Sequence, residues 1–140
     1  MLTHKECEIL NAHTKGTMME ALGMKFMPTD DDCVVVEMPI MPATSQHLGI
    51  LHGGAYLALA ETVAGAGSMH LTGFSAAVCG VEVSGNHLRM SATKGKVYGR
   101  GTLLAEGNTL HVWNVNVEDE TGQILSTSRV VNRIMMQNPK

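Results

Sequence analysis

The chain has 140 residues, which is enough for one domain with a core of its own, and we expect a single domain over residues 1–140. Its net charge of -3 provides no basic surface for a nucleic acid partner. Charged residues make up only 16% of the chain, so it has less polar surface than a free monomer needs. This composition favours an oligomer.

The cysteines and the hydropathy pattern exclude further classes of protein. Cys7, Cys33 and Cys79 are an odd number without CxxC spacing, so they provide neither a disulfide framework nor a zinc site. The first residues are charged, unlike a signal peptide, and the longest apolar stretch is too short to cross a bilayer. We therefore expect a cytoplasmic protein without a metal, another cofactor or membrane contact.

The first half of the chain predicts short helices, a strand and one long helix. Helix-forming residues come first, and a β-branched run follows the turn-rich segment 28–32. The expected elements are helices at 4–13 and 17–22, a strand at 33–40, a loop at 41–49 and a helix at 54–70. The long helix is apolar on every side, so we expect it to be buried on every side. Gly65 and Gly67 within it indicate close approach of another backbone or of a ligand.

The second half of the chain predicts strands joined by tight turns. Residues 109–120 alternate between His111, Trp113, Val115 and Val117 on one side and more polar residues on the other. The expected strands are 75–90, 95–106, 109–120 and 123–136. One long apolar helix among such strands predicts an α+β fold, in which a strongly curved antiparallel sheet wraps the helix. A second copy of the chain would cover what remains of the helix.

Glu61 is the one charged residue between Ala55 and Met69, in the middle of the long helix. An ionised carboxylate in apolar surroundings is normally paired, neutralised or functional. One interpretation is a structural Glu61 held by Arg89 or by a backbone amide. The other is a general base or nucleophile whose pKa is tuned by its apolar surroundings.

The helix opens with His52, Gly53 and Gly54. Bare backbone N–H groups at a helix N-terminus suit a carbonyl oxygen that becomes an oxyanion during attack. His52 is a candidate to orient the acyl group, and the alternative is a histidine that only caps the helix.

Gly53 and Glu61 lie eight residues apart, which is about 12 Å along a helix, so one chain cannot bring both to one carbonyl carbon. Two antiparallel copies of the helix across a two-fold axis can, which predicts a homodimer with two shared sites.

The pattern GxLHGGAxxxLAE at residues 49–61 resembles the hotdog-fold acyl-CoA thioesterases, in particular the phenylacetate-pathway-like group. Within that group the chain resembles the thioesterases for 1,4-dihydroxy-2-naphthoyl-CoA and for proofreading in enterobactin synthesis. The resemblance implies a hotdog fold, a homodimer or homotetramer, and an acyl-CoA substrate. It makes Glu61 the catalytic carboxylate and the Gly53 amide the group that polarises the thioester carbonyl. It also implies that His52 and Gln46 orient the thioester and the leaving thiolate.

The resemblance further implies contacts for the acyl group and for coenzyme A. Leu48 corresponds to an acyl-pocket position. Relatives often carry Ser or Thr four residues after the glutamate, where this chain has Gly65, which leaves room for a bulkier acyl group. Ser68 shares that helix face about 10 Å beyond Glu61. The implied coenzyme A contacts are Gly80, His87, Arg89 and Asn108, of which Arg89 suits a phosphate best. The alternative for Arg89 is an exposed arginine at the end of a strand.

The residues leave two other functions open. A hydratase or dehydratase that acts on enoyl or 3-hydroxyacyl thioesters would use His52 and Glu61 to move protons. A sensor would bind acyl-CoA without turnover. A thioesterase acting on an aryl (1,4-dihydroxy-2-naphthoyl) or medium-chain acyl-CoA is the function we expect.

Overall fold

The computed structural model describes residues 1–137, so the last three residues of the expected domain lie outside the described part. Most expected elements are confirmed within one to three residues at either end. The helices are α1 (His4–His13), α2 (Met18–Ala21) and α3 (Gly53–Leu71), with a 3-10 turn η1 (Pro42–Thr44) in the expected loop. The strands are β1 (Lys25–Met27), β2 (Val34–Pro39), β3 (Ala76–His87), β4 (Lys96–Glu106), β5 (Leu110–Asp119) and β6 (Ile124–Met136).

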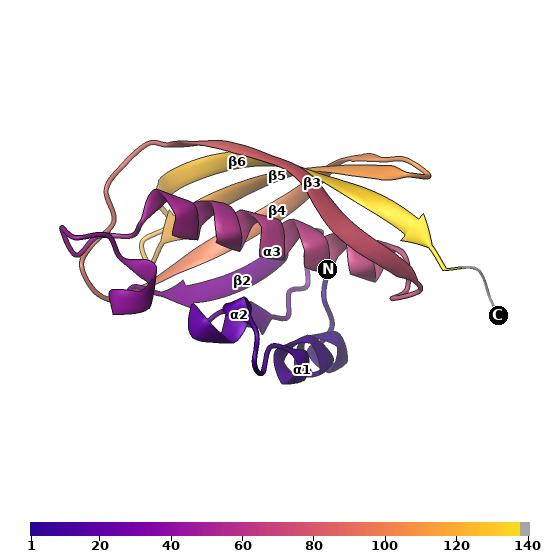
Figure 1. Ribbon diagram of the computed structural model, residues 1–140, viewed down its shortest axis with the longest axis horizontal. Coiled ribbons are helices and arrows are strands. Elements are labelled where there is room, and N and C mark those ends of the chain that lie inside the picture. The colour runs from indigo at the N-terminus through magenta and orange to yellow at the C-terminus, as the bar shows by residue number, and fades with distance from the viewer. Residues whose placement is uncertain (138–140) are drawn as a thin grey trace.

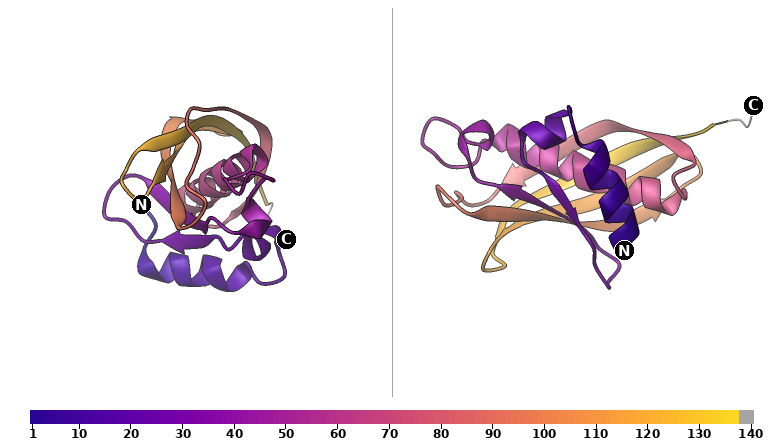
Figure 2. Two further views of the ribbon diagram at one scale, coloured as in Figure 1. Left: turned by 90° about the vertical axis from the view of Figure 1, so that its left-hand side faces the viewer. Right: turned by 90° about the horizontal axis from the view of Figure 1, so that it is seen from below.

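The strands form one antiparallel sheet of six, in the order β1-β2-β4-β5-β6-β3. The sheet curves around α3, as Figure 1 and the end-on view in Figure 2 show. The alternation expected in β5 is confirmed, because His111, Trp113, Val115 and Val117 are buried and Asn114 and Asn116 are half-buried. The core lies between this sheet and α3.

At Gly67 a side chain, and not the backbone or ligand that we expected, lies close to the long helix. A Cβ atom at this position would overlap the ring of Trp113, which is fully buried on β5. Gly65, two residues earlier, has no atom within 4 Å of its Cβ position. The two glycines therefore serve different purposes: Gly67 lets the helix lie against the sheet, and Gly65 leaves open space.

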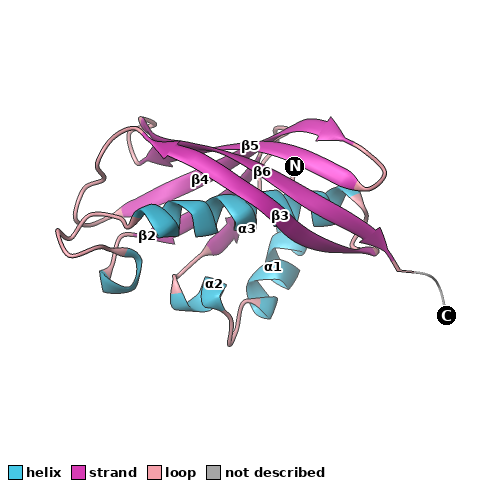
Figure 3. Cartoon of the chain, turned by 45° about the horizontal axis from the view of Figure 1, so that its top comes forward, coloured by secondary structure: helices cyan, strands magenta, loops and turns pink. Residues whose placement is uncertain are grey.

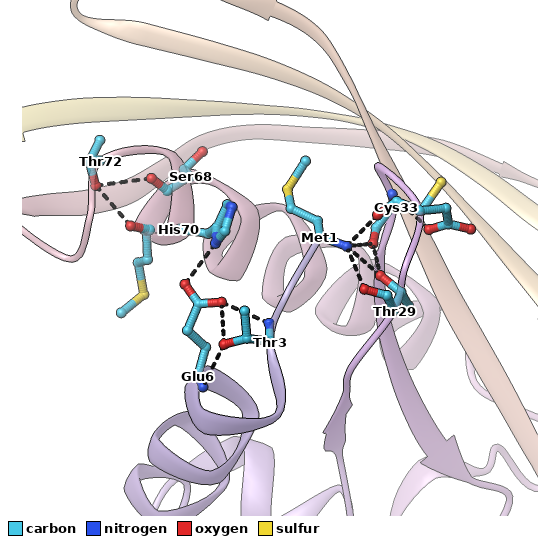
Figure 4. Close-up of polar contacts among 10 residues, drawn as sticks. Met1, Thr3, Glu6, Thr29, Cys33, Ser68, His70 and Thr72 are labelled. Carbon is cyan, nitrogen blue, oxygen red and sulfur yellow. Dashed lines mark hydrogen bonds and ion pairs between the residues drawn. The ribbon is translucent and has the colours of Figure 1, made fainter.

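The two short helices lie on the side of α3 that faces away from β3, β5 and β6 (Figure 1, Figure 3). Thr3 caps α1 in a capping box with Glu6, and the Glu6 carboxylate also lies 2.7 Å from Nδ1 of His70 on α3 (Figure 4). Burial raises the pKa of Glu6, but the hydrogen bonds from Thr3 and His70 outweigh it and hold the pKa below its usual value. The Glu6–His70 contact fixes the start of α1 against the end of α3.

The expectation that α3 is buried on every side is wrong for the single chain. Glu61 and Gly54 are exposed, and Leu57, Ala58 and Gly65 on the same side are half-buried. The sheet and the short helices cover the other faces of α3, where Leu59, Ala60 and Val63 have no exposed surface. One face of a strongly apolar helix is thus left without cover from the other residues that the structure describes. Within residues 1–137, no helix combines the length and hydropathy of a membrane span.

Candidate active site

The start of α3 presents one unpaired backbone donor. His52 is the N-cap, and its Nδ1 accepts a hydrogen bond of 2.8 Å from the N–H of Gly54. This is the capping role considered for His52, and it occupies the Gly54 N–H. The N–H of Gly53 has no acceptor among residues 1–137. Gly53 therefore remains as the donor that can meet an incoming carbonyl oxygen at the positive end of the helix dipole.

A pocket of about 240 Å³ opens beside Gly53, and two of the expected coenzyme A contacts line it. His87 lies directly against Gly53, because a Cβ atom at position 53 would be 2.9 Å from His87 Nε2. The His87 ring stacks on Tyr56, with centroids 4.9 Å apart, and its Nδ1 lies 2.8 Å from Ser126 Oγ. Arg89 lines the same pocket. The structure thus brings Gly53, His87 and Arg89 together within one chain.

Glu61 lies farther along α3, against the edge strand β3. Its Oε2 atom is 2.5 Å from where a Cβ atom of Gly80 would be, so the missing side chain of Gly80 makes room for the carboxylate. The pairing of β3 with β6 shifts register between Gly80 and Glu82, which places an irregularity of the strand at this point. Among residues 1–137 Glu61 forms no ion pair, so the partner considered for it, Arg89, does not hold it. Gly80, which we expected to contact coenzyme A, therefore lies beside the Glu61 carboxylate.

Ser68 belongs to the interior. It has no exposed surface, and its hydroxyl lies 2.9 Å from Trp113 Nε1, 3.0 Å from Asn132 Nδ2 and 3.0 Å from His111 Nδ1. Burial lowers the pKa of His111, which favours the neutral ring at this position. The geometry favours a role for Ser68 in bracing α3 against β5 and β6 over the expected contact with an acyl group.

Three expected site residues lie apart from both the pocket beside Gly53 and the surroundings of Glu61 in the single chain: Gln46, Leu48 and Asn108. Gln46 lines a separate pocket in the loop before α3, where its side chain accepts a hydrogen bond from the N–H of Leu48. Leu48 is 65% exposed at the tip of that loop. Asn108 lies in the exposed turn between β4 and β5. This turn is at the far end of the sheet from His87, since β5 begins opposite Arg133 whereas His87 pairs with Ser126.

The sequence alone did not indicate the residues that surround Gly53 and Glu61. Tyr56 follows Gly53 by one helical turn, so the spacing alone indicates that both face the same side. Ser126 and Asn132 become neighbours of the site only through the pairing of β6 with β3, which no local pattern of the sequence reveals.

Comparison with known proteins identifies the family. A family model described as the thioesterase superfamily matches residues 48–126, more than half of the chain. The chain belongs to this superfamily. The matched segment contains both the start of α3 and Glu61, and the expected hotdog fold is confirmed.

The chain is similar over nearly its whole length to named bacterial enzymes. The 1,4-dihydroxy-2-naphthoyl-CoA hydrolase of Escherichia coli is 35% identical, over 91% of this chain and 93% of that protein. The proofreading thioesterase EntH of Cronobacter turicensis is 36% identical, over 94% and 96%. A crystal structure of a thioesterase from Haemophilus influenzae superposes with a TM-score of 0.88 at 28% identity, covering 97% of this chain and 92% of that one. The chain is therefore a thioester hydrolase.

Proposed function

We propose that the chain hydrolyses an aryl or medium-chain acyl-CoA to the free acid and coenzyme A, in a site that two copies complete. The observation that carries this proposal is the unpaired N–H of the half-buried Gly53 at the start of α3, together with the exposed Glu61 carboxylate on the face of α3 that residues 1–137 leave uncovered. They are about 12 Å apart along the helix. Two antiparallel α3 helices place the Gly53 of one chain opposite the Glu61 of the other.

The edge strand β3 supports the same assembly. Its 12 residues make it a long edge, and most of them are exposed. Long exposed edges with apolar side chains, such as Val81 at 59% exposure, are sites where another strand pairs. Antiparallel pairing of two β3 strands would join the sheets of two copies and bring their α3 helices side by side. A homotetramer, a pair of such dimers, is the larger assembly we expect from the family.

In this site the reaction begins when Glu61 acts on the thioester. As a general base it takes a proton from water, whose oxygen attacks the carbonyl carbon; as a nucleophile it attacks that carbon itself and water then hydrolyses the anhydride. The carbonyl oxygen gains negative charge and accepts a hydrogen bond from the N–H of Gly53. The C–S bond then breaks, and the thiolate leaves and is protonated as coenzyme A. His52 and Gln46 are candidates to orient the thioester and the departing sulfur.

The pocket beside Gly53 suits the coenzyme A portion of the substrate. Arg89 offers a planar pair of donors for a phosphate of coenzyme A. The His87 ring lies in the same pocket, against Gly53, next to the proposed oxyanion donor. Because Gly53 and Arg89 belong to the same pocket, one chain would hold the coenzyme A tail and the carbonyl oxygen while the other supplies Glu61. Asn108 of the second chain is a candidate to contact the nucleotide end of coenzyme A.

Thiol release from a panel of aryl- and alkyl-CoA thioesters, measured for wild type and Glu61→Gln, tests the proposal. Gln keeps the size of the side chain but can neither accept the proton nor attack, so we expect kcat to fall at least about a thousandfold, or about 4 kcal/mol of barrier. The variant should sediment like wild type. Equal rates would remove Glu61 from the mechanism, and a new double bond or added water without thiol release would indicate a hydratase.

A further inference from the structure

Beside Glu61, α3 offers no second side chain that can hold a water molecule. If Glu61 acts as a general base it takes one proton of the water, and a group that accepts the other proton would direct an oxygen lone pair at the carbonyl carbon. The residues one helical turn before and after Glu61 are Leu57, Ala58, Ala64 and Gly65, and none of them has a polar side chain. The second acceptor must therefore come from another element.

Asn132 on β6 lies next to the Glu61 carboxylate, beside Gly80. Gly80 and Asn132 are opposite each other where β3 pairs with β6. The position of a Cβ atom at Gly80 is 2.5 Å from Glu61 Oε2 and 3.8 Å from Asn132 Oδ1. Two oxygens this close to one point can share one water molecule, because each hydrogen bond of a water is about 2.8 Å long. The missing side chain of Gly80 leaves room beside both oxygens.

A buried network holds the amide of Asn132 in one orientation. Asn132 is 1% exposed, and its Nδ2 donates to Ser68 Oγ at 3.0 Å. Trp113 Nε1 donates to the same oxygen at 2.9 Å, and His111 Nδ1 lies 3.0 Å from it. A hydroxyl accepts two hydrogen bonds and donates one, so with two N–H donors present the Ser68 proton goes to His111. With Nδ2 fixed in this way, Asn132 Oδ1 stays on the Gly80 side.

We propose that Asn132 is a further catalytic residue, which holds the attacking water together with Glu61. Within residues 1–137 no donor bonds to Asn132 Oδ1, so this oxygen can accept a hydrogen bond from the water. Ser68 is a positioning residue, because it fixes the amide. The inference rests on the proposed function, and of the two routes given there it selects the general base.

The hydrogen bond to Asn132 transfers no proton during the reaction. Glu61 takes the other proton of the water as the water oxygen forms its bond to the carbonyl carbon. When the C–S bond breaks, the sulfur keeps the electron pair and takes that proton from Glu61. The products are the free acid and the thiol of coenzyme A, and Glu61 is again a carboxylate.

Asn132→Thr and Asn132→Val are a matched pair of variants that test the proposal. Threonine and valine have nearly the same shape, and both suit a strand. A threonine hydroxyl can donate to Ser68 and accept from the water at once, whereas a valine side chain can do neither. In thiol release from benzoyl- and octanoyl-CoA, we expect kcat to fall about a hundredfold in Asn132→Val and less than about tenfold in Asn132→Thr.

The split between kcat and KM separates this role from a structural one. KM should change less than about twofold in both variants, because Asn132 contacts the water and not the acyl-CoA. Ser128→Ala is the control, since Ser128 lies on the same strand, is 3% exposed and should keep full activity. Ser68→Ala keeps the test decisive if Asn132→Val does not fold. It frees the amide of Asn132, so kcat should fall about tenfold with KM unchanged.

A single turnover in water labelled with a heavy oxygen isotope, with enzyme in excess, tests the route itself. Attack of water on the carbonyl carbon puts one solvent oxygen into the acid released in that turnover. Acid without the label, together with label in the Glu61 side chain, would make Glu61 the nucleophile. That result would overturn the inference and leave the proposed function intact.

The kinetic outcomes also separate the inference from the proposed function. Wild-type kcat in folded Asn132→Val would overturn the inference. Equally low kcat in the threonine and valine variants, or a loss that appears in KM, would overturn it too, because Asn132 would then serve the structure or substrate binding. Thiol release from no thioester by the wild-type protein would instead defeat the proposed function, and this inference with it.

Discussion

Gly80 sets the position of the proposed catalytic carboxylate by having no side chain. Glu61 reaches across to β3, and its Oε2 atom occupies the space next to Gly80 where a Cβ atom would be 2.5 Å away. The flexible end of Glu61 can move aside at small cost in stability. Any such movement shifts the carboxylate that we propose acts on the thioester, and catalysis is sensitive to displacements of this size.

Gly80→Ala should therefore separate activity from stability. We expect kcat to fall at least about tenfold, because the added methyl group pushes the carboxylate away from its position. The free energy of unfolding should stay the same or rise, because glycine weakens a strand interior. Cys79→Ala, at the exposed neighbouring position of β3, is the control and should keep full activity. Full activity of folded Gly80→Ala would mean that the carboxylate works from another position.

At the same scale, the sequence makes the candidate site residues conspicuous but does not predict their surroundings. Glu61 is conspicuous because it interrupts an apolar segment, and Gly53 because it opens a helix. The exposure of Glu61 could not be predicted, since an apolar helix does not reveal which of its faces the sheet leaves bare. The capping contact of His52 was one of the two interpretations that its position directly before the helix allowed.

Among the elements, α3 shows how two glycines in one helix have opposite effects. Gly67 faces Trp113 on β5, and the fully buried indole leaves no space for a methyl group. Gly65 has no described atom within 4 Å of its Cβ position, so nothing in the described part of the chain packs against it. A glycine in a helix costs up to about 1 kcal/mol relative to alanine, so its presence at each position has a separate reason.

Alanine at these two positions should change the free energy of unfolding in opposite directions. Gly67→Ala should destabilise by about 1–3 kcal/mol, because the Trp113 ring must move within a packed core. Gly65→Ala should stabilise by up to about 1 kcal/mol, because it adds helix propensity without a clash. Urea unfolding of the two variants beside wild type measures both. Equal effects at the two positions would contradict the packing described for α3.

The elements were predictable where they are long and periodic. The alternation in β5 and the length of α3 identify them from the sequence alone. β1 was missed because its three residues, Lys25–Met27, are too few to show a period, and it exists by pairing with β2. The order of the sheet, with β3 beside β6 at the edge, depends on contacts between segments far apart in the chain.

At the scale of the whole molecule, one chain holds two separate groups of residues that we propose are the halves of one site. The first half is the Gly53 N–H with His87 and Arg89, and the second is Glu61 with Gly80. The spacing of Gly53 and Glu61 on a helix was enough to predict this separation. The exposed edge of β3 and the uncovered face of α3 are where we propose that a second copy binds.

The measurement that tests this account most directly mixes two inactive variants. Glu61→Gln lacks the carboxylate, and Gly53→Pro lacks the N–H at the first helical position, which proline accepts. Gly53→Ala, which puts a Cβ against His87 but keeps the N–H, is the control for the effect of bulk. If two chains share the site, equal mixing with subunit exchange should restore about a quarter of the wild-type rate, because half of the dimers carry one intact site. No recovery in folded, exchanged protein would contradict the shared site.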